Sequence, residues 1–246
     1  MINMAHIAVL GLGNWGTAIA RLWLLEGHKV KGWTIEQEVY ESIMMRDTNE
    51  KYLADHPVPG LDATMHLDEA MDGSEIIVLA VPSSVILDVM EDVLPHLQPG
   101  HVLLDLAKGL APGKRLISEA IHTRLKEEGK ANPLAVLTGP TIAPEAAGGV
   151  MTTALVASED QAIAHRLAQT LSTPSFILHP ASDPVGAELW GAYKNVVALA
   201  CGLVDGLKQI GDLGGDNLKA GIFMSGFKEG CLLLAELGAR AEVAFG

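Results

Sequence analysis

The apolar and polar positions in the first half of the chain alternate between two kinds of segment. Five short runs rich in Val, Ile and Leu are HIAVLG, HKVKGWT, EIIVLAVP, HVLLDLAKG and PLAVLTG, starting at positions 6, 28, 75, 101 and 133. Such runs are typical of strands buried on both faces, as in a parallel sheet. Helical periodicity fills the intervening segments, at residues 14–26, 36–45, 83–94 and 113–128. The alternation predicts an α/β fold with a Rossmann-like, doubly wound and mostly parallel sheet.

The pattern changes toward the C-terminal end. Two more strands and three more helices are predicted, at residues 151–158, 174–180, 159–171, 184–210 and 214–238. No strand pattern follows Asp183, and the polar stretch HPASDP at 179–184 separates the two parts. We therefore expect a Rossmann-like sheet domain over residues 1–180 and the start of an all-helical domain over residues 181–246.

A glycine-rich loop follows the first predicted strand and opens the first predicted helix. It reads Gly11-Leu12-Gly13-Asn14-Trp15-Gly16, a G-x-G-x-x-G pattern in the context that marks a dinucleotide site. Gly11 permits a tight turn, Gly13 lets the backbone approach a pyrophosphate, and Gly16 lets the helix lie close to the strand. We take Gly11, Gly13, Asn14, Trp15 and Gly16 as candidate cofactor-binding residues. The alternative is a glycine-rich turn that holds no ligand.

Glu36 lies just past the second predicted strand, twenty residues after Gly16. An acid at this place accepts a hydrogen bond from the ribose 2′-hydroxyl and repels a 2′-phosphate. No arginine lies between Val30 and Tyr40, so the pattern favours NAD over NADP, with NADP as the open alternative. Glu36 could instead act only as an acid at a helix N-terminus.

Three predicted strand ends carry residues that could meet above the sheet, since ligands collect outside the carboxyl ends of strands in open α/β sheets. Pro82 follows one strand, Lys108 a second, and Gly139 and Thr141 a third. Lys108 can reach a negative group over the sheet edge, although a lysine there can also be an ordinary solvated one.

A lysine interrupts the apolar segment ELWGAYKNVVALACGLVDGL, which otherwise predicts a buried helix. Lys194 is the lysine, and Asn195 follows it. Burying an ammonium group without a partner costs several kcal/mol, so Lys194 needs an explanation. It is either a functional acid or base, or a side chain that extends along apolar surface and keeps its charge in water.

The charge and the cysteine and histidine content of the chain limit the kinds of molecule that it is expected to bind. A formal net charge of -13 argues against nucleic acid or an anionic membrane surface as the partner. The two cysteines, Cys201 and Cys231, fit buried thiols in a reducing cytosol, and no signal peptide or membrane span is evident. The histidines lack metal-ligand spacing, so we expect no metal site. We expect a cytoplasmic protein with a small-molecule ligand.

Six motifs in order now resemble one known family: GLGNWGTAIA, VPS, KGL, GPTIAPE, GAYKNVVALACGLVDGL and GDNLKA. The chain resembles the NAD-dependent glycerol-3-phosphate dehydrogenases from His6 to about Glu229. The resemblance implies reversible reduction of dihydroxyacetone phosphate to sn-glycerol 3-phosphate with a nicotinamide cofactor. It also implies a homodimer.

The resemblance assigns roles to individual positions. Lys194 is implied to be the general acid or base, and Lys108 to lie beside both substrate and cofactor. Substrate contacts are implied for Gly139, Thr141 and Asn195. Cofactor contacts are implied for Pro82 and Ala143.

Two departures from the family pattern open other interpretations. Ser225 stands where family members carry an arginine, and a short uncharged side chain cannot make bidentate phosphate contacts. We also expect the C-terminal part of the family pattern to be absent, as in a fragment or a natural short form, and therefore weak activity for this chain alone. The alternatives are a catalytically impaired NAD-binding sensor or interaction protein, and a related dehydrogenase of a 3-hydroxyacid or ketopantoate.

Overall fold

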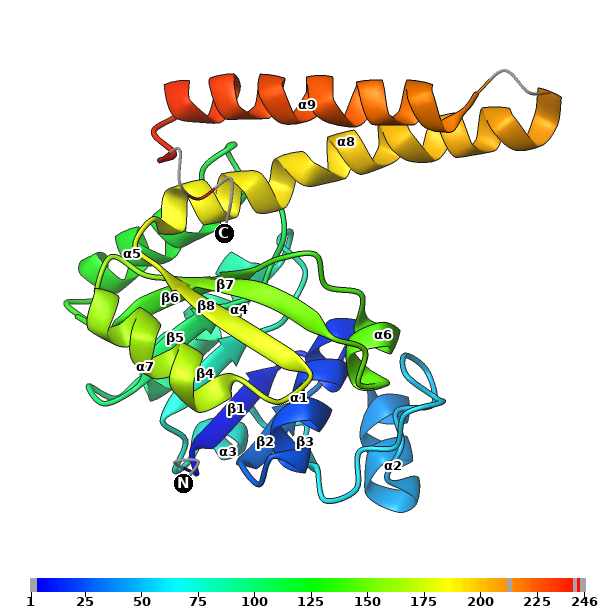
Figure 1. The fold of residues 1–246 in the computed structure, drawn as a ribbon. Helices are drawn as coiled ribbons and strands as arrows, with labels where there is room; N and C mark the ends of the chain where they lie inside the picture. Colours follow the sequence, from blue (N-terminus) through cyan, green and yellow to red (C-terminus); the bar gives the residue numbers. More distant parts are fainter. Residues whose placement is uncertain (1–3, 212–213, 241–242, 244–246) are drawn as a thin grey trace.

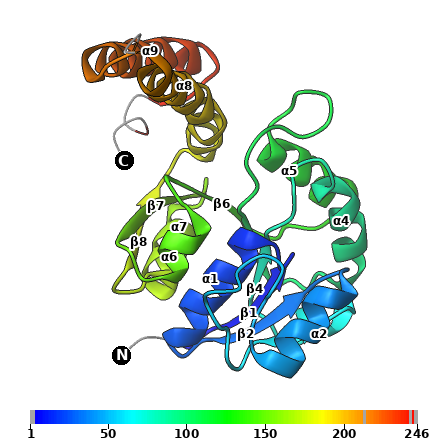
Figure 2. The ribbon, with the colours of Figure 1, turned by 90° about the vertical axis from the view of Figure 1, so that its right-hand side faces the viewer.

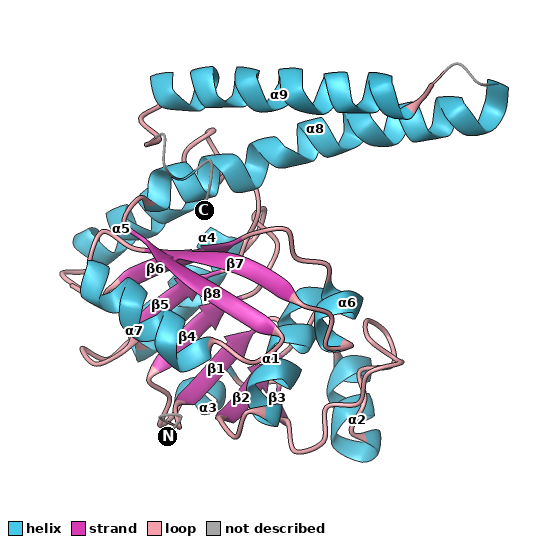
Figure 3. Cartoon of the chain, in the orientation of Figure 1, coloured by secondary structure: helices cyan, strands magenta, loops and turns pink. Residues whose placement is uncertain are grey.

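The computed structural model describes residues 4–211, 214–240 and 243. Its centre is one eight-stranded sheet in the order β3-β2-β1-β4-β5-β6-β7-β8 (Figures 1 and 3). The strands are β1 His6–Leu10, β2 Lys29–Trp33, β3 Asp62–Thr64, β4 Ile76–Leu79, β5 Val102–Asp105, β6 Leu134–Thr138, β7 Thr152–Ala157 and β8 Phe176–Ala181. Every neighbouring pair is parallel except β6 and β7, which are antiparallel. The predicted Rossmann-like, mostly parallel sheet is confirmed.

Helices cover both faces of this sheet and then continue beyond it. They are α1 Asn14–Leu25, α2 Gln37–Arg46, α3 Leu67–Met71, α4 Ile86–Val93, α5 Ile117–Glu127, α6 Ala143–Ala147, α7 Gln161–Leu171, α8 Pro184–Gly211 and α9 Asp216–Glu236, with a short 3-10 turn at Leu94–His96. None of the helices in the described part of the chain is both long enough and apolar enough to cross a membrane.

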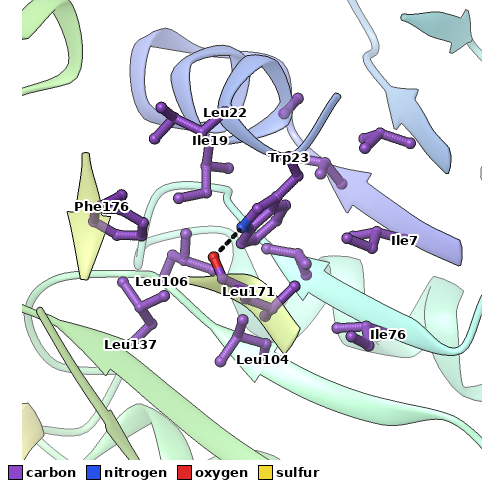
Figure 4. Packing of buried hydrophobic residues seen from close by; sticks show 14 of the residues in the cluster. Ile7, Ile19, Leu22, Trp23, Ile76, Leu104, Leu106, Leu137, Leu171 and Phe176 are labelled. Atoms are coloured by element: carbon purple, nitrogen blue, oxygen red, sulfur yellow. Dashed lines mark hydrogen bonds between the residues drawn. The ribbon is translucent and has the colours of Figure 1, made fainter. Parts of the chain in front are cut away.

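The alternation of side chains along each strand divides the core into two layers. In β1, Ile7 and Val9 join the layer under α1, α2 and α7, whereas Ala8 and Leu10 join the layer under α3, α4 and α5. Trp23 of α1 is fully buried in the first layer, where its indole N–H donates to the Leu171 carbonyl at 3.0 Å (Figure 4). Burial on both faces explains the continuous apolar runs of the sequence.

The strand order reverses between β1 and β4, because the chain runs outward from β1 through β2 to β3 and returns to β4 on the other side. Loops at the carboxyl ends of β1 and β4 therefore diverge and leave a crevice between them. The glycine-rich loop follows β1, and Pro82 follows β4. The topology thus places two of the predicted site segments side by side.

The long helices α8 and α9 form an antiparallel hairpin that extends away from the sheet (Figures 1 and 2). Trp190 of α8 stacks on Phe227 of α9 with ring centroids 5.5 Å apart, and Tyr193 donates to the Gly226 carbonyl at 3.0 Å. Only the first turns of α8 lie against the sheet, through contacts with β6 and β7.

The prediction of a buried helix is wrong for most of α8. Leu199 is 76% exposed and Ile210 is 80% exposed, because beyond its first turns α8 is covered on the α9 side alone within the described residues. Three short elements, β3, α3 and α6, were also missed. Each has at most five residues, which is too short for a periodic pattern to register.

Candidate functional site

A cavity of about 1050 Å³ opens at the crevice between the ends of β1 and β4. Its walls come from the glycine-rich loop, the end of β2, the segments after β4 and β5, and the segment before α6. Most of the predicted cofactor residues line it: Gly11, Gly13, Asn14, Trp15, Glu36, Pro82, Lys108 and Ala143. The structure therefore brings together residues that lie up to 132 positions apart in the sequence.

The three glycines of the loop differ in what a side chain at each position would meet. Gly11 has φ +107, and a Cβ there would lie 2.8 Å from the Ala80 carbonyl oxygen. A Cβ on Gly16 would clash with the Gly11 carbonyl, so Gly16 permits the close approach of α1. Gly13 has φ -75, and a Cβ there would meet nothing within 4 Å. Protein packing does not explain Gly13, whereas a ligand approaching its backbone would.

Asn49 holds this loop in place from a distant segment. Its buried side-chain amide donates to the Leu12 carbonyl and to the Thr17 hydroxyl, each at 2.8 Å. Thr17 in turn donates to the same Leu12 carbonyl at 3.2 Å. Sequence reasoning missed Asn49 because its partners are 32 and 37 residues away and no motif marks it.

Glu36 is the N-cap residue of α2 and carries two partners that the sequence did not predict. Lys51 donates to it, and the Tyr52 hydroxyl donates to it at 2.8 Å. Lys51 also donates to Glu38. The hydrogen bond from Lys51, and then that from Tyr52, hold the pKa of Glu36 below its ordinary value, so Glu36 is ionised at neutral pH. The carboxylate of Glu36 thus lines the cavity with a cation, Lys51, bonded to it from outside the lining.

Lys108 lies just past β5, and its ammonium group donates to the Thr141 hydroxyl at 3.1 Å. Gly109, with φ +121, turns the chain immediately after it. The Lys108 side chain as a whole is exposed, yet the protein around its ammonium group removes enough water to lower its pKa. Lys108 thus reaches from the end of β5 to the segment that follows β6.

Lys194 approaches the same loop from α8. Its half-buried ammonium group donates to the Gly139 carbonyl, two residues before the partner of Lys108. Burial, and secondly the charge of Lys108, lower the pKa of Lys194 to about 8. Two lysines from different elements are thus held by one stretch of three residues, 139–141, which follows β6.

Gly139 and Lys194 line a second cavity, whereas Asn195 lines neither cavity. Gly139 and Lys194 line a smaller cavity of about 390 Å³ together with Trp190 and His179. A Cβ on Gly139 would lie 2.9 Å from Ala154, so this glycine is required for contact with β7. Asn195 is exposed and lines neither cavity.

The chain matches two family models in succession. Residues 6–164 match the N-terminal model of NAD-dependent glycerol-3-phosphate dehydrogenase, and residues 183–246 match the C-terminal model of the same family. The chain belongs to the NAD-dependent glycerol-3-phosphate dehydrogenase family. The glycine-rich loop and Lys108 lie within the first match, and Lys194 lies within the second.

Curated relatives and solved structures agree with this membership. Glycerol-3-phosphate dehydrogenase [NAD(P)+] of an Exiguobacterium species is 40% identical over 96% of this chain and 68% of its own length. The Rhodospirillum rubrum protein of the same name is 38% identical over 98% of this chain and 67% of its own length. A glycerol-3-phosphate dehydrogenase structure from Coxiella burnetii superposes with a TM-score of 0.87 at 31% identity, covering 99% of this chain and 72% of that one.

The match at residues 183–246 overturns one prediction. The C-terminal part of the family pattern was expected to be absent, and it is present over these residues. Ser225, which stands where the family pattern has an arginine, is exposed on α9. The family names support the glycerol-3-phosphate interpretation and not its two alternatives. A 3-hydroxyisobutyrate dehydrogenase structure is 17% identical, which shows a shared fold alone.

The donor set of the site fits a dinucleotide. The N-terminus of α1 begins at Asn14 beside the open space at Gly13, where free backbone N–H groups and the helix dipole favour phosphate. Within the described residues, no group of three or more His, Cys, Asp or Glu side chains is placed to hold a metal ion.

Replacing Gly13 by alanine tests this fit. We expect Gly13→Ala to leave the free energy of unfolding within about 0.5 kcal/mol of wild type, because its φ suits alanine and the new Cβ meets no protein atom. We expect NADH affinity, measured by calorimetry, to fall about tenfold or more, because the methyl group occupies the path of the pyrophosphate. Unchanged affinity in the folded variant would show that no ligand approaches the loop here.

Proposed function

We propose that this chain interconverts dihydroxyacetone phosphate and sn-glycerol 3-phosphate by hydride transfer with NAD(P)(H), with Lys194 as general acid and base. The observation that carries the proposal is the convergence of Lys108 and Lys194 on residues 139–141, beside the dinucleotide cavity. Membership of the family, and relatives named glycerol-3-phosphate dehydrogenase, support the same reaction.

The reaction needs a proton to move at the C2 oxygen of the substrate. Reduction of the ketone adds that proton, and oxidation of the alcohol removes it. With a pKa of about 8, Lys194 is present as both ammonium and amine near physiological pH. The ammonium form donates to the carbonyl oxygen, and the amine form accepts from the hydroxyl. The half-buried setting of Lys194 thus brings its pKa toward the value that a reversible reaction requires.

The neighbouring groups suit a phosphorylated substrate. Lys108 supplies a second positive charge, and Thr141 supplies a hydroxyl at the same place. We propose that Lys108, Gly139 and Thr141 contact the substrate. A contact from Asn195 stays a prediction of the family resemblance, since its side chain lies outside both cavities.

The cofactor would be held by the larger cavity. We propose that Gly11, Gly13 and the N-terminus of α1 bind its pyrophosphate, while Glu36 accepts from the ribose 2′-hydroxyl. Other walls of the cavity, at Asn14, Trp15, Pro82 and Ala143, complete the binding surface. When bound, the nicotinamide group supplies or accepts the hydride. The carboxylate of Glu36 supports a preference for NAD over NADP. Lys51 weakens that preference because its positive charge partly neutralises Glu36.

The proposal extends to the organisation of the chain into domains, its assembly and its location. We propose a cofactor-binding domain at residues 1–180 and a helical domain from 181, because β8 ends at Ala181 and α8 begins at Pro184. The exposed apolar side chains of α8 and α9, among them Leu199 and Phe223, support a homodimer that buries them. Two free cysteines, Cys201 and Cys231, support a cytoplasmic location.

Replacing Lys194 tests the proposed acid and base. We expect Lys194→Met to lower kcat for dihydroxyacetone phosphate reduction by about 10²- to 10⁴-fold, because a positioned proton donor is worth that factor. NADH absorbance follows the reaction, and calorimetry should show an NADH affinity within about twofold of wild type, since Lys194 lies outside the dinucleotide cavity.

Lys208→Met is the matched control, because Lys208 is an exposed lysine farther along α8 that pairs with Asp216 at 3.3 Å. It should keep wild-type kcat. Equal activity of the Lys194 and Lys208 variants would refute the role of Lys194.

Glu36 and Lys51 set the cofactor preference in opposite directions. Glu36→Gln removes the charge that repels a 2′-phosphate, so we expect the kcat/KM ratio of NADPH to NADH to rise about tenfold, equivalent to ~1.4 kcal/mol. Lys51→Met removes the cation that neutralises Glu36, so the same ratio should fall.

Glu38→Gln controls for the loss of an acid beside Lys51, because Glu38 pairs with Lys51 but does not line the cavity. Steady-state kinetics with both cofactors measures the ratio. The assignment fails if the Glu36 and Glu38 variants shift it equally.

A further inference from the structure

The position of Lys194 depends on how the first turns of α8 are held. Four of the buried residues of α8 lie in its first turns, at Gly186, Ala187, Glu188 and Gly191. Beyond Lys194, most of the large apolar side chains of α8, such as Leu199, are exposed, while Val204 is buried. Within the described residues, the contacts that hold Lys194 against the sheet therefore come from a segment of about two turns.

Glu188 is the charged group in that segment, and only 3% of it is exposed. Its carboxylate accepts from the Ser118 hydroxyl at 2.6 Å, from the Ser118 backbone N–H at 3.2 Å, and from the Ile117 backbone N–H. Both donors lie in the first turn of α5, about seventy positions earlier in the chain.

These bonds cap α5 from another part of the fold. The N-cap residue of α5 is Leu116, whose side chain cannot accept a hydrogen bond. Glu188 satisfies two of the N–H groups that a helix N-terminus leaves unpaired, and its charge suits the positive end of the helix dipole. The bonds thus join α8 to α5. The N–H groups of α5 lack a partner within their own helix, and the carboxylate of Glu188 on α8 supplies it.

Glu188, Gly191 and Lys194 are spaced by three residues, so they follow one ridge of α8. Glu188 binds α5, and a Cβ on Gly191 would lie 2.5 Å from the Thr138 hydroxyl at the end of β6. Lys194 binds the Gly139 carbonyl, one residue further on. Six residues correspond to about 9 Å along a helix, so the Glu188 and Lys194 contacts lie within two turns of each other on α8.

A second buried acid lies near this ridge. Asp105 at the end of β5 accepts from the Ala107 N–H at 2.9 Å and so shapes the segment that carries Lys108. Burial, with a smaller contribution from the charge of Glu188, raises the pKa of Asp105 to about 8. Asp105 is therefore mostly protonated at neutral pH. Burial raises the pKa of Glu188 above its ordinary value, the hydrogen bonds from Ser118 and Ile117 oppose that rise, and the charge of exposed Glu119 adds a smaller rise.

We propose that Glu188 is a positioning residue for Lys194: its hydrogen bonds to the first turn of α5 fix the depth and rotation at which α8 docks on the sheet, and so hold the Lys194 ammonium group against Gly139. The inference rests on the proposed function in that Lys194 is the acid and base. Glu188 itself touches neither cavity.

The test measures the pKa of Lys194 directly, by competitive acetylation of the full chain over a range of pH and mass spectrometry of the peptide that contains Lys194. Wild type should give about 8. In Glu188→Ala, α8 loses its anchor and the ammonium group gains water, so we expect the pKa to rise by about one unit or more. Loss of a negative charge alone would lower the pKa, so the sign separates positioning from electrostatics.

Glu119→Ala is the matched control, because it removes an exposed acid from the same turn of α5. It should leave the Lys194 pKa unchanged or slightly lower. Glu188→Gln keeps the volume and one acceptor oxygen, and it should raise the pKa by less than Glu188→Ala. Circular dichroism shows whether Glu188→Ala is folded. If it is not, the direction of the Lys194 pKa shift in Glu188→Gln decides in the same way.

An unchanged or lowered Lys194 pKa in the folded Glu188 variant overturns the proposal. The proposal is also overturned if the variant loses turnover only in proportion to its unfolded fraction while the pH profile of kcat stays the same as in wild type. The acetylation readout does not need turnover. A chain without dehydrogenase activity would therefore count against the proposed function, while the pKa shift still decides the role of Glu188.

Discussion

Two ammonium groups held by one short loop form the constraint on which the site depends. Lys108 and Lys194 bond to Thr141 and Gly139, so two like charges share a partly desolvated place at the end of β6. The arrangement is costly for the charged form of Lys194, which is why its pKa falls to about 8. That cost has a chemical use, because it makes the amine form available to accept a proton.

The fold supplies this proximity from separate elements. The sheet brings the segment after β5 beside the loop after β6, because these strands are neighbours and run parallel. The helix α8 must then be docked onto the antiparallel end of the sheet, where β6 meets β7. Reversal of strand order between β1 and β4 places the dinucleotide cavity next to the same loop. The proposed sites of cofactor binding and of proton transfer thus meet at one sheet edge.

The features predictable from the sequence were those with a local signature. The glycine-rich loop, the alternating strands and helices, and Lys108 at a strand end each follow from residues that are close in the chain. The partners of Glu36 and Glu188, and the open space beside Gly13, could not be predicted in this way. Lys51 and Ser118 reach their acids only after folding, and the open space at Gly13 is a property of the folded loop.

The exposure of α8 was mispredicted for a related reason. Its apolar composition predicts burial, but composition does not say which surface covers it, and Leu199 and Ile210 are exposed here. Lys194 therefore owes its half-buried state to the docking of the first turns of α8 and not to an apolar helix around it. The cause of its lowered pKa is tertiary contact, which a sequence pattern does not encode.

The pH dependence of kcat in both directions tests the central claim most directly. If Lys194 is the shared acid and base, oxidation of sn-glycerol 3-phosphate should rise with pH through about 8, because the amine form must accept a proton. Reduction of dihydroxyacetone phosphate should fall through the same value, because the ammonium form must donate. Two profiles that move in the same direction, or that show no common transition near 8, would contradict the account.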